Sequence, residues 1–316
     1  MRYTTILFLT SFLSLSFLLQ AMDHNGFDLS KRVVEMNEIV DGGPERDSVP
    51  ALTLPRFIST KEANNLYSLD DEAIIVNVAG IQKAYPIRIL NWHGVVNDHI
   101  AGKDIVVAYC PLSGAGLVFD LSSFQEKMDF GVSGLIYQSA MLLYDKQSES
   151  LWSHLAKKAI AGPHAGRPLT LLPSSQKKLR NYLLENPNTQ VLKAPEDPSI
   201  LRGYSVNPYA GYDQDQNVYF PIEVADNSVP AKTRSLLVLY RKDALIIPID
   251  RLDPRARKTR VSIGKRLVDI SYDAKSGEIS GDAGYSPVRF ISGYWFALRT
   301  FYPKARVFTG DSSSKK

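Results

Sequence analysis

The chain has 316 residues, of which 44% are hydrophobic and 22% are charged, and its formal net charge is +4 at pH 7. This is the balance of an ordinary globular protein, and the length is enough for one large domain or two ordinary ones. The densest basic cluster lies within 255–260 and is typical of a solvated loop, so the charge pattern excludes nucleic acid as the expected partner.

The N-terminal residues have the pattern of a secretory signal peptide. Arg2 precedes an apolar run from Ile6 to Leu19, and Ala21 supplies a small residue for cleavage. The run is short for a membrane-spanning helix. We predict cleavage after Ala21, which makes 1–21 the signal peptide and the mature protein periplasmic or extracellular, without a transmembrane span. An uncleaved N-terminal membrane anchor is the alternative.

Short strands dominate the predicted elements that follow. After a polar lead over 22–40, the arm over 41–57 contains a Gly pair and three prolines, which exclude a regular helix. A short helix is expected within 59–71, capped by Ser59 or Thr60, and a second helix over 174–186, capped by Ser174 or Ser175. Strands are expected at 73–80, 83–90, 103–110, 116–121, 127–134 and 140–145. No helix-length connection separates them, which favours antiparallel pairing.

Two segments of the chain resemble each other in sequence. The segment "IIVNVAGIQKAYPIRIL" (74–90) aligns without gaps to "LLVLYRKDALIIPIDRL" (236–252). We interpret it as a faint duplication, with chance similarity between strands as the alternative. The second copy has Arg255 in place of His93 and Asp273 in place of Cys110. We expect an α+β, β-rich fold of mainly antiparallel strands in two related units (about 74–120 and 236–282) with a few helices. These form a single globular domain over 41–310, with a disordered tail over 311–316.

The only cysteine, Cys110, ends one of the expected strands and follows closely on the segment 90–100. That segment contains Trp92, His93, Asp98 and His99. If the 105–110 strand runs antiparallel beside the 84–90 strand, Cys110 approaches His93. A thiolate and an imidazole bind soft metals such as copper, or the imidazole activates the thiol as a nucleophile. The alternatives are a buried, inert cysteine, a structural His93 and a surface His99.

A second dense stretch lies at 130–155. Ser133 stands in G-V-S-G rather than in the G-x-S-x-G of a hydrolase, and His154 is a candidate third metal ligand or a solvent-facing residue. The stretch contains no phosphate-binding Gly loop, no H-E-x-x-H and no dinucleotide fingerprint, and neither does the rest of the chain. We expect six residues to line the pocket around Cys110 and His93: Trp92, Asp98, Ser113, Ser133, Tyr144 and Trp152.

Five ordered runs carry a family resemblance: "DGGPERDSVPAL", "AYPIRILNWHGVVND", "VAYCPLSGAGLVFD", "FGVSGLIYQSAMLLYDKQSESLWS" and "YWFALRTFYPKARVF". Together they resemble the prokaryotic family catalogued as Domain of Unknown Function 3179, over about 41–308. The resemblance implies an exported or membrane-anchored protein and no particular activity. The chain departs from the family pattern at Ser113, where the usual motif is C-P-L-C-G, at Gly94, where it is W-H-E, and at His154, where it is SLWSQ. The first departure argues against a dithiol switch, because no disulfide can close.

Three hypotheses remain open. The protein binds a soft metal, perhaps copper, through Cys110 and His93, or it is an enzyme with Cys110 as nucleophile and His93 as base. In the third, it is a non-catalytic binding or scaffold module whose aromatic-rich loops at 204–220 and 285–302 meet a partner.

Overall fold

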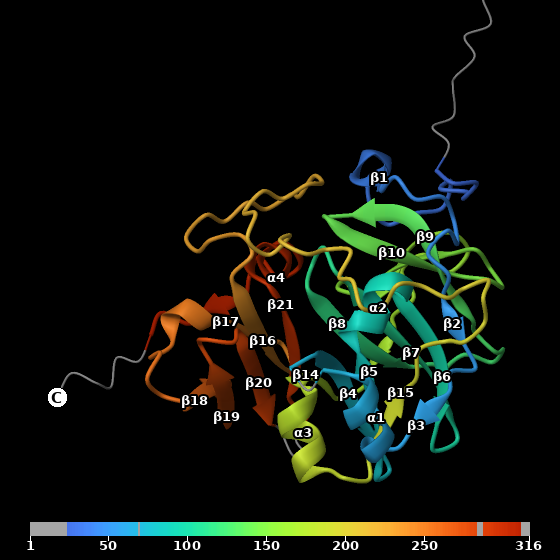
Figure 1. Ribbon diagram of the computed structural model, residues 1–316. Helices are drawn as coiled ribbons and strands as arrows, with labels where there is room; N and C mark the ends of the chain where they lie inside the picture. Colours follow the sequence, from blue (N-terminus) through green and yellow to red (C-terminus); the bar gives the residue numbers. More distant parts are fainter. Residues whose placement is uncertain (1–23, 69, 283–286, 311–316) are drawn as a thin grey trace, which may run out of the picture.

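The computed structural model describes residues 24–310 apart from 69 and 283–286. The expected signal peptide and C-terminal tail lie outside the described residues. Within the described part, no helix is long and apolar enough to cross a membrane. Strands dominate and form five sheets with mainly antiparallel pairing, and a few short helices pack around them (Figure 1). The expectation of a β-rich, mainly antiparallel fold is confirmed.

Three sheets of five strands are built from the first two-thirds of the chain. The first consists of β1 (Ile39–Asp41), β9 (Phe130–Tyr137), β10 (Ala140–Asp145), β11 (Leu151–Ser153) and β12 (Lys158–Ala161). The second consists of β13 (Thr170–Leu171), β8 (Ala115–Asp120), β7 (Lys103–Cys110), β6 (Val95–Ile100) and β2 (Leu52–Thr53). The third consists of β14 (Ser174–Lys178), β4 (Glu72–Val78), β5 (Ile81–Pro86), β15 (Gln190–Leu192) and β3 (Phe57–Ile58).

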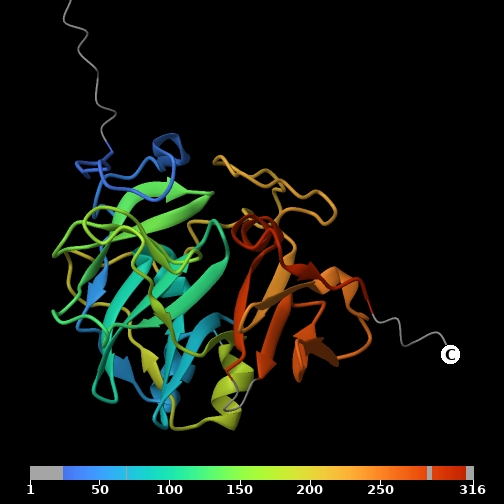
Figure 2. The same cartoon turned by 180° about the vertical axis from the view of Figure 1, so that it is seen from behind.

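The last third of the chain builds two smaller sheets, which lie beside the first three in both views (Figures 1 and 2). One consists of β21 (Arg289–Tyr294), β16 (Arg234–Tyr240), β17 (Asp243–Pro248) and β22 (Arg306–Val307). The other consists of β18 (Lys258–Ile263), β19 (Arg266–Asp273) and β20 (Glu278–Asp282). The helical elements are η1 (Met36–Glu38), α1 (Thr60–Leu66), α2 (Ile87–His93), α3 (Leu179–Glu185), η2 (Ile249–Arg251) and α4 (Trp295–Phe301).

The expected pairing of the 105–110 strand with the 84–90 strand is wrong. β7 pairs with β6, in a register that sets Val95 opposite Ala108, and on its other side with β8. Residues 87–93 form α2 instead of continuing the strand, because Pro86 caps the helix and the apolar residues after it are buried at helical spacing. The helix ends at Gly94, whose φ of 66° is favourable only for glycine.

The two predicted helices have different outcomes. α1 begins after Ser59, which confirms the first of the two expected caps, and Ser59 forms a capping box with Glu62. The predicted helix over 174–186 is wrong in its first half, because residues 174–178 form β14 along the edge of β4 and only Leu179–Glu185 are helical. Pairing with an available sheet edge outweighs the helical preference of "SSQKK".

The two segments that resemble each other in sequence have the same order of elements. The first runs through β4, β5, α2, β6, β7 and β8, and the second through β16, β17, η2, β18, β19 and β20. Val76 pairs with Lys83 in one hairpin, and the aligned Val238 pairs with Leu245 in the other. Cys110 is opposite Ala115, just as Asp273 is opposite Glu278. Whether this likeness reflects a duplication stays a prediction.

The largest hydrophobic core joins the two parts of the chain. It combines Cys110, Ala115 and Leu117 of the second sheet with Leu237 of β16 and Trp295 of α4, all fully or almost fully buried. Burial of large apolar side chains is the main stabilising term in folding, so a shared core couples the two parts energetically.

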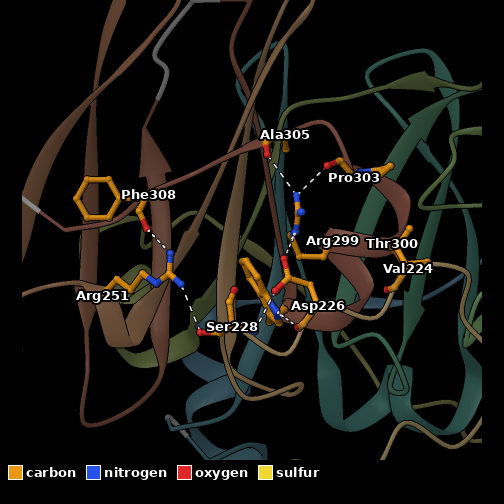
Figure 3. Close-up of polar contacts among 10 residues, drawn as sticks. Val224, Asp226, Ser228, Arg251, Arg299, Thr300, Pro303, Ala305 and Phe308 are labelled. Carbon is orange, nitrogen blue, oxygen red and sulfur yellow. Dashed lines mark hydrogen bonds and ion pairs between the residues drawn. The ribbon is translucent and has the colours of Figure 1, made fainter.

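The long connection between β15 and β16 is anchored at its C-terminal end by polar contacts, shown in Figure 3. Arg299 of α4 donates from Nε to the Asp226 carboxylate at 2.9 Å, and Thr300 donates to the Val224 carbonyl at 3.0 Å. Arg251 donates to the carbonyls of Ser228 and Phe308. These contacts hold the end of a connection whose middle covers the candidate site.

Candidate functional site

Cys110 is fully buried at the end of β7. Its Sγ accepts a hydrogen bond from the backbone N–H of Met141 at 3.3 Å, next to a register shift between β9 and β10. Ser113, in the turn that follows, donates from Oγ to the Cys110 carbonyl at 3.3 Å. Burial raises the pKa of the thiol above its ordinary value, so at neutral pH the sulfur is a thiol and not a thiolate.

His93, the last residue of α2, is also fully buried. Its Nδ1 lies 2.8 Å from the Pro50 carbonyl oxygen, and its Nε2 lies 2.6 Å from the Tyr204 hydroxyl. A carbonyl only accepts, so Nδ1 carries the proton and Nε2 accepts from Tyr204. Burial lowers the pKa of this imidazole. Both nitrogens are thus engaged in structural hydrogen bonds, and neither bonds to Cys110.

The other residues proposed from the segment 90–100 have contacts of their own. The Asp98 side chain is only 6% exposed, and its Oδ2 accepts from Lys83 Nζ and from the Tyr85 hydroxyl, each at 2.7 Å. It therefore does not act as a partner of His93 in place of the glutamate that the W-H-E pattern would supply. Trp92 donates from Nε1 to the Val206 carbonyl at 3.2 Å. His99 is exposed beside Asp104, as expected for a surface residue.

Three residues that were expected to form a wall around Cys110 belong to the first sheet and stabilise it. Ser133 donates to the Leu142 carbonyl at 2.7 Å. Tyr144 donates to the Asp47 carboxylate, and its ring lies under the Arg46 guanidinium. Trp152 donates from Nε1 to Asp145 Oδ2 at 2.8 Å. The structure does not place any of the three in the lining of the pocket that contains Cys110.

That pocket is mainly apolar, with a volume of about 170 Å³. Cys110, Leu112, Val132 and Met141 line it together with Tyr209 and Phe220 of the long connection. Gly94 also lines it, and a Cβ at this position would lie 3.3 Å from Met141 Sδ. A side chain at position 94 would press against this wall, and the φ of +66° there is strained for residues other than glycine.

A larger, polar pocket of about 320 Å³ adjoins it. Two ion pairs line it, Arg234 with Glu72 at 2.5 Å and Arg88 with Asp71 at 3.1 Å. Asp70 and Asp213 add two further carboxylates to the lining. Among the described residues, none is a hydrogen-bond partner of the pocket-lining hydroxyls of Tyr109, Tyr209 and Tyr294. Hydroxyl groups of this kind both donate and accept hydrogen bonds, and the excess of carboxylates in the lining disfavours an anion. The pocket therefore suits a hydrogen-bonding group without negative charge.

The two pockets are neighbours and together make up the candidate site, since Asn91, Pro111 and Tyr209 line both. The loop 204–220 covers the site, and the segment 90–93 holds this loop in place through Trp92, His93 and an Asn91–Asn207 hydrogen bond of 3.1 Å. The motif around His93 is thus close to the site, but its contacts position the loop. Sequence reasoning missed Arg234, Tyr109 and Tyr294, since lone arginines and tyrosines far apart in the chain give no signal.

His154 follows β11 and is fully buried. Neither of its ring nitrogens has a hydrogen-bond partner in the part of the chain that the structure describes. Burial lowers its pKa to about 4, and the neighbouring backbone of Met141 opposes this shift only in part. The expected alternative of a solvent-facing residue is wrong. Across residues 24–310, with 69 and 283–286 left aside, no three His, Cys, Asp or Glu side chains are grouped so as to hold a metal ion.

Comparison with protein families gives one finding. The model of the family described as "Protein of unknown function (DUF3179)" matches residues 46–305, which is most of the chain. The comparison with curated proteins and the comparison with solved structures gave no significant match.

Proposed function

The chain belongs to the family described as "Protein of unknown function (DUF3179)", and from its site we propose that it is an exported binding protein for a small amphipathic molecule. The proposal takes up the hypothesis of a non-catalytic binding module. Its ligand places an uncharged, hydrogen-bonding head in the polar pocket and an apolar part in the pocket of Cys110. Export is inferred from the N-terminal sequence pattern.

One observation carries the proposal: a polar and an apolar pocket share the lining residues Asn91, Pro111 and Tyr209 beneath one aromatic loop. Small-molecule sites are typically concave and largely apolar, with a few convergent polar groups that fix orientation. Tyr109, Tyr209 and Tyr294 supply such groups, and Arg234 is held rigidly by Glu72 and by the Gly114 carbonyl. Preformed groups of this kind lose little conformational entropy on binding.

The nucleophile hypothesis gains no comparable support. A cysteine nucleophile needs a depressed pKa or an adjacent base. The Cys110 thiol has a raised pKa, and His93 uses both nitrogens elsewhere. In the proposed function Cys110 is an apolar wall of the site. The β16–β20 unit, which has Asp273 in the corresponding position, supplies Arg234 and the scaffold.

The probe for this proposal is octyl β-glucoside below its micellar concentration, with glucose as the chain-free control. Isothermal titration calorimetry is expected to show one octyl glucoside bound per chain and at least tenfold weaker binding of glucose. Tyr209→Ala removes a side chain common to both pockets and is expected to weaken octyl glucoside binding at least tenfold. Tyr182→Ala, on α3 and outside both pockets, is the matched control. Absence of saturable binding, or equal weakening by both variants, contradicts the proposal.

A further inference from the structure

The basic cluster that stands out in the sequence, within 255–260, is largely neutralised in the folded protein. Three of its arginines form ion pairs with carboxylates on the same strands or the turns beside them: Arg255 with Asp253, Arg257 with Asp273 and Arg260 with Asp269. Pairs of this kind leave little net charge to attract a partner. The cations that the fold leaves unbalanced lie elsewhere on the same two small sheets.

Two hairpin turns carry these unbalanced cations. Arg241 and Lys242 form the turn between β16 and β17. Lys265 lies in the turn between β18 and β19, and Arg266 is the first residue of β19. All four side chains are exposed, and none of them forms an ion pair with a carboxylate in the part of the chain that the structure describes.

One tyrosine joins the two turns. The guanidinium of Arg241 lies 5.4 Å from the centre of the Tyr240 ring, and that of Arg266 lies 6.0 Å from the same centre. The turns also touch directly, since a Cβ at Gly264 would lie 3.2 Å from Tyr240 Cδ1. The two turns therefore present one basic surface, which we call the basic tip and which consists of Arg241, Lys242, Lys265 and Arg266.

The surroundings of the basic tip do not cancel its charge. Arg306 of β22 adds an exposed cation, and it donates to the Ser262 carbonyl at 3.1 Å, just before the β18–β19 turn. The carboxylates nearest to the two turns in the sequence are Asp243 and Asp269. Asp269 is already paired with Arg260, so Asp243 alone of these two is left to offset the tip.

An exposed aliphatic side chain adjoins the cations. Leu267 follows Arg266 in β19 and is 69% exposed. Cations beside an exposed large apolar side chain match the surface of a membrane that contains anionic lipids, where each Lys or Arg contributes about fivefold to the affinity. The leucine inserts between the head groups and the acyl chains. A soluble polyanion is bound through the cations alone, so Leu267 favours the membrane.

We propose that the basic tip docks the protein on a membrane surface that contains anionic phospholipid, with Leu267 in contact with the lipid. The phosphates of the head groups pair with the cations of the tip. This docking goes beyond the proposed ligand binding, because none of the residues of the basic tip lines either pocket. An exported protein docked in this way holds its ligand site close to a membrane.

The experiment measures co-sedimentation of the predicted mature chain with lipid vesicles. This chain starts at residue 22, because the apolar run before it would insert into vesicles by itself. The native chain is expected to bind vesicles of mixed phosphatidylglycerol and phosphatidylcholine, and to bind phosphatidylcholine alone at least about tenfold more weakly. Raising the salt from about 50 mM to about 500 mM is expected to weaken binding to the mixed vesicles at least about tenfold, because salt screens the charges.

Charge reversal at the two turns tests the basic tip itself. Lys242→Glu combined with Lys265→Glu is expected to weaken binding to the mixed vesicles at least about tenfold. Lys61→Glu combined with Lys146→Glu changes the net charge by the same amount at exposed positions on α1 and after β10, and is the matched control. The control pair is expected to change binding less than about threefold.

Leu267→Ser removes the apolar contact and keeps every charge of the tip. It is expected to weaken binding to the mixed vesicles at least about threefold. All the substituted positions are exposed, and thermal unfolding checks that each variant is folded.

Equal binding to both kinds of vesicle, or equal weakening by the tip pair and the control pair, overturns the proposal. Heparin tests the other class of partner. A native chain that binds heparin but not the mixed vesicles, or vesicle binding that Leu267→Ser leaves unchanged, identifies a site for soluble polyanions and contradicts membrane docking. Octyl glucoside binding is measured without vesicles, so the failure of this proposal and the failure of the proposed function are distinguishable.

Discussion

At the scale of single residues, the molecule contains buried polar groups with opposite consequences for stability. His154 is buried without a hydrogen-bond partner in the described part of the chain, whereas the buried Asp98 is fully engaged by Lys83 and Tyr85. The His154 imidazole makes the fold sensitive to acid, because its protonated form is disfavoured in a buried position. The Lys83–Asp98 pair stabilises the fold only as long as both charges are present.

The pH dependence of stability tests the environment of His154. Its pKa is about 4 in the folded protein and about 6.5 in the unfolded chain. The unfolded state therefore binds the proton first, and stability is lost as the pH falls from about 6.5 towards 4. Between pH 7 and 5 the native protein is expected to lose about 2 kcal/mol more than His154→Gln, as measured by urea unfolding. His99→Gln should follow the native protein, and identical pH profiles for His154→Gln and the native protein would contradict this environment.

Asp98 provides a comparison between a buried and an exposed pair. Asp98→Asn leaves the Lys83 ammonium buried without its counter-charge and is expected to lower the free energy of unfolding by about 3 kcal/mol. Asp104→Asn breaks the exposed pair with His99 on the neighbouring strand and is expected to cost less than 1 kcal/mol. Urea unfolding at pH 7 measures both, and equal losses would show that burial does not matter here.

The residues of the segment 90–110 could be selected from the sequence, but their roles could not. Cys110 and His93 stand out by residue type, yet a hydrogen bond to Tyr204, more than one hundred positions away, decides what His93 does. The sequence left a solvent-facing position open for His154, because the residues near it in the chain do not indicate which other residues bury its side chain. Arg234 lines the site from a different sheet, and no local pattern marks it.

At the scale of elements, the arm over 42–47 packs so closely on β9 that Gly134 has no room for a side chain. A Cβ at Gly134, where φ is +78°, would lie 2.1 Å from the Pro44 carbonyl oxygen. Gly102, in the β6–β7 turn, has nearly the same φ of +79° with nothing within 4 Å of its Cβ position. Substitutions at the two glycines therefore distinguish the cost of backbone strain from the cost of steric contact.

We expect Gly102→Ala to cost about 1 kcal/mol, the strain of a left-handed conformation for alanine. Gly134→Ala should cost at least about 2 kcal/mol more, because the arm must also move. Since Gly134 and Pro44 line the apolar pocket, only Gly134→Ala should weaken octyl glucoside binding. Chemical denaturation and calorimetry check both effects, and similar losses of stability in the two variants would argue against the docked arm.

Elements with local signals were predictable, and elements decided by pairing were not. Ser59, one of the two expected caps, marks the start of α1. Residues 174–178 carry a helical composition, but the open edge of β4 makes them a strand. The expected partner strand of β7 was also wrong, because the alternation of residues along a strand does not identify the strand that pairs with it.

At the scale of the whole molecule, the five sheets share buried residues across the two parts of the chain. Leu117 and Trp152 from the first part and Leu237 and Trp295 from the second belong to one core. Arg234 adds an ion pair with Glu72 across the same boundary. The sequence suggested two related units, but it gave no indication that the polar pocket lies where they meet.

The shared core predicts a single cooperative unfolding transition. The chain has three tryptophans, so the experiment uses a Trp92→Phe background. In that background Trp152→Phe leaves only Trp295 and Trp295→Phe leaves only Trp152, so fluorescence reports each part separately. The midpoints in urea are expected to coincide with each other and with circular dichroism, after correction for any difference in stability between the two variants. Two transitions, with one tryptophan exposed well before the other, would show that the parts unfold independently.

The position of a bound probe tests the central claim that one ligand spans both pockets. A crystal structure of the protein with octyl β-glucoside is expected to show the alkyl chain against Leu112 and Met141. The sugar should lie within hydrogen-bonding distance of Tyr109 or Tyr294. Detergent found only at other places on the protein, with both pockets filled by water, would contradict the account.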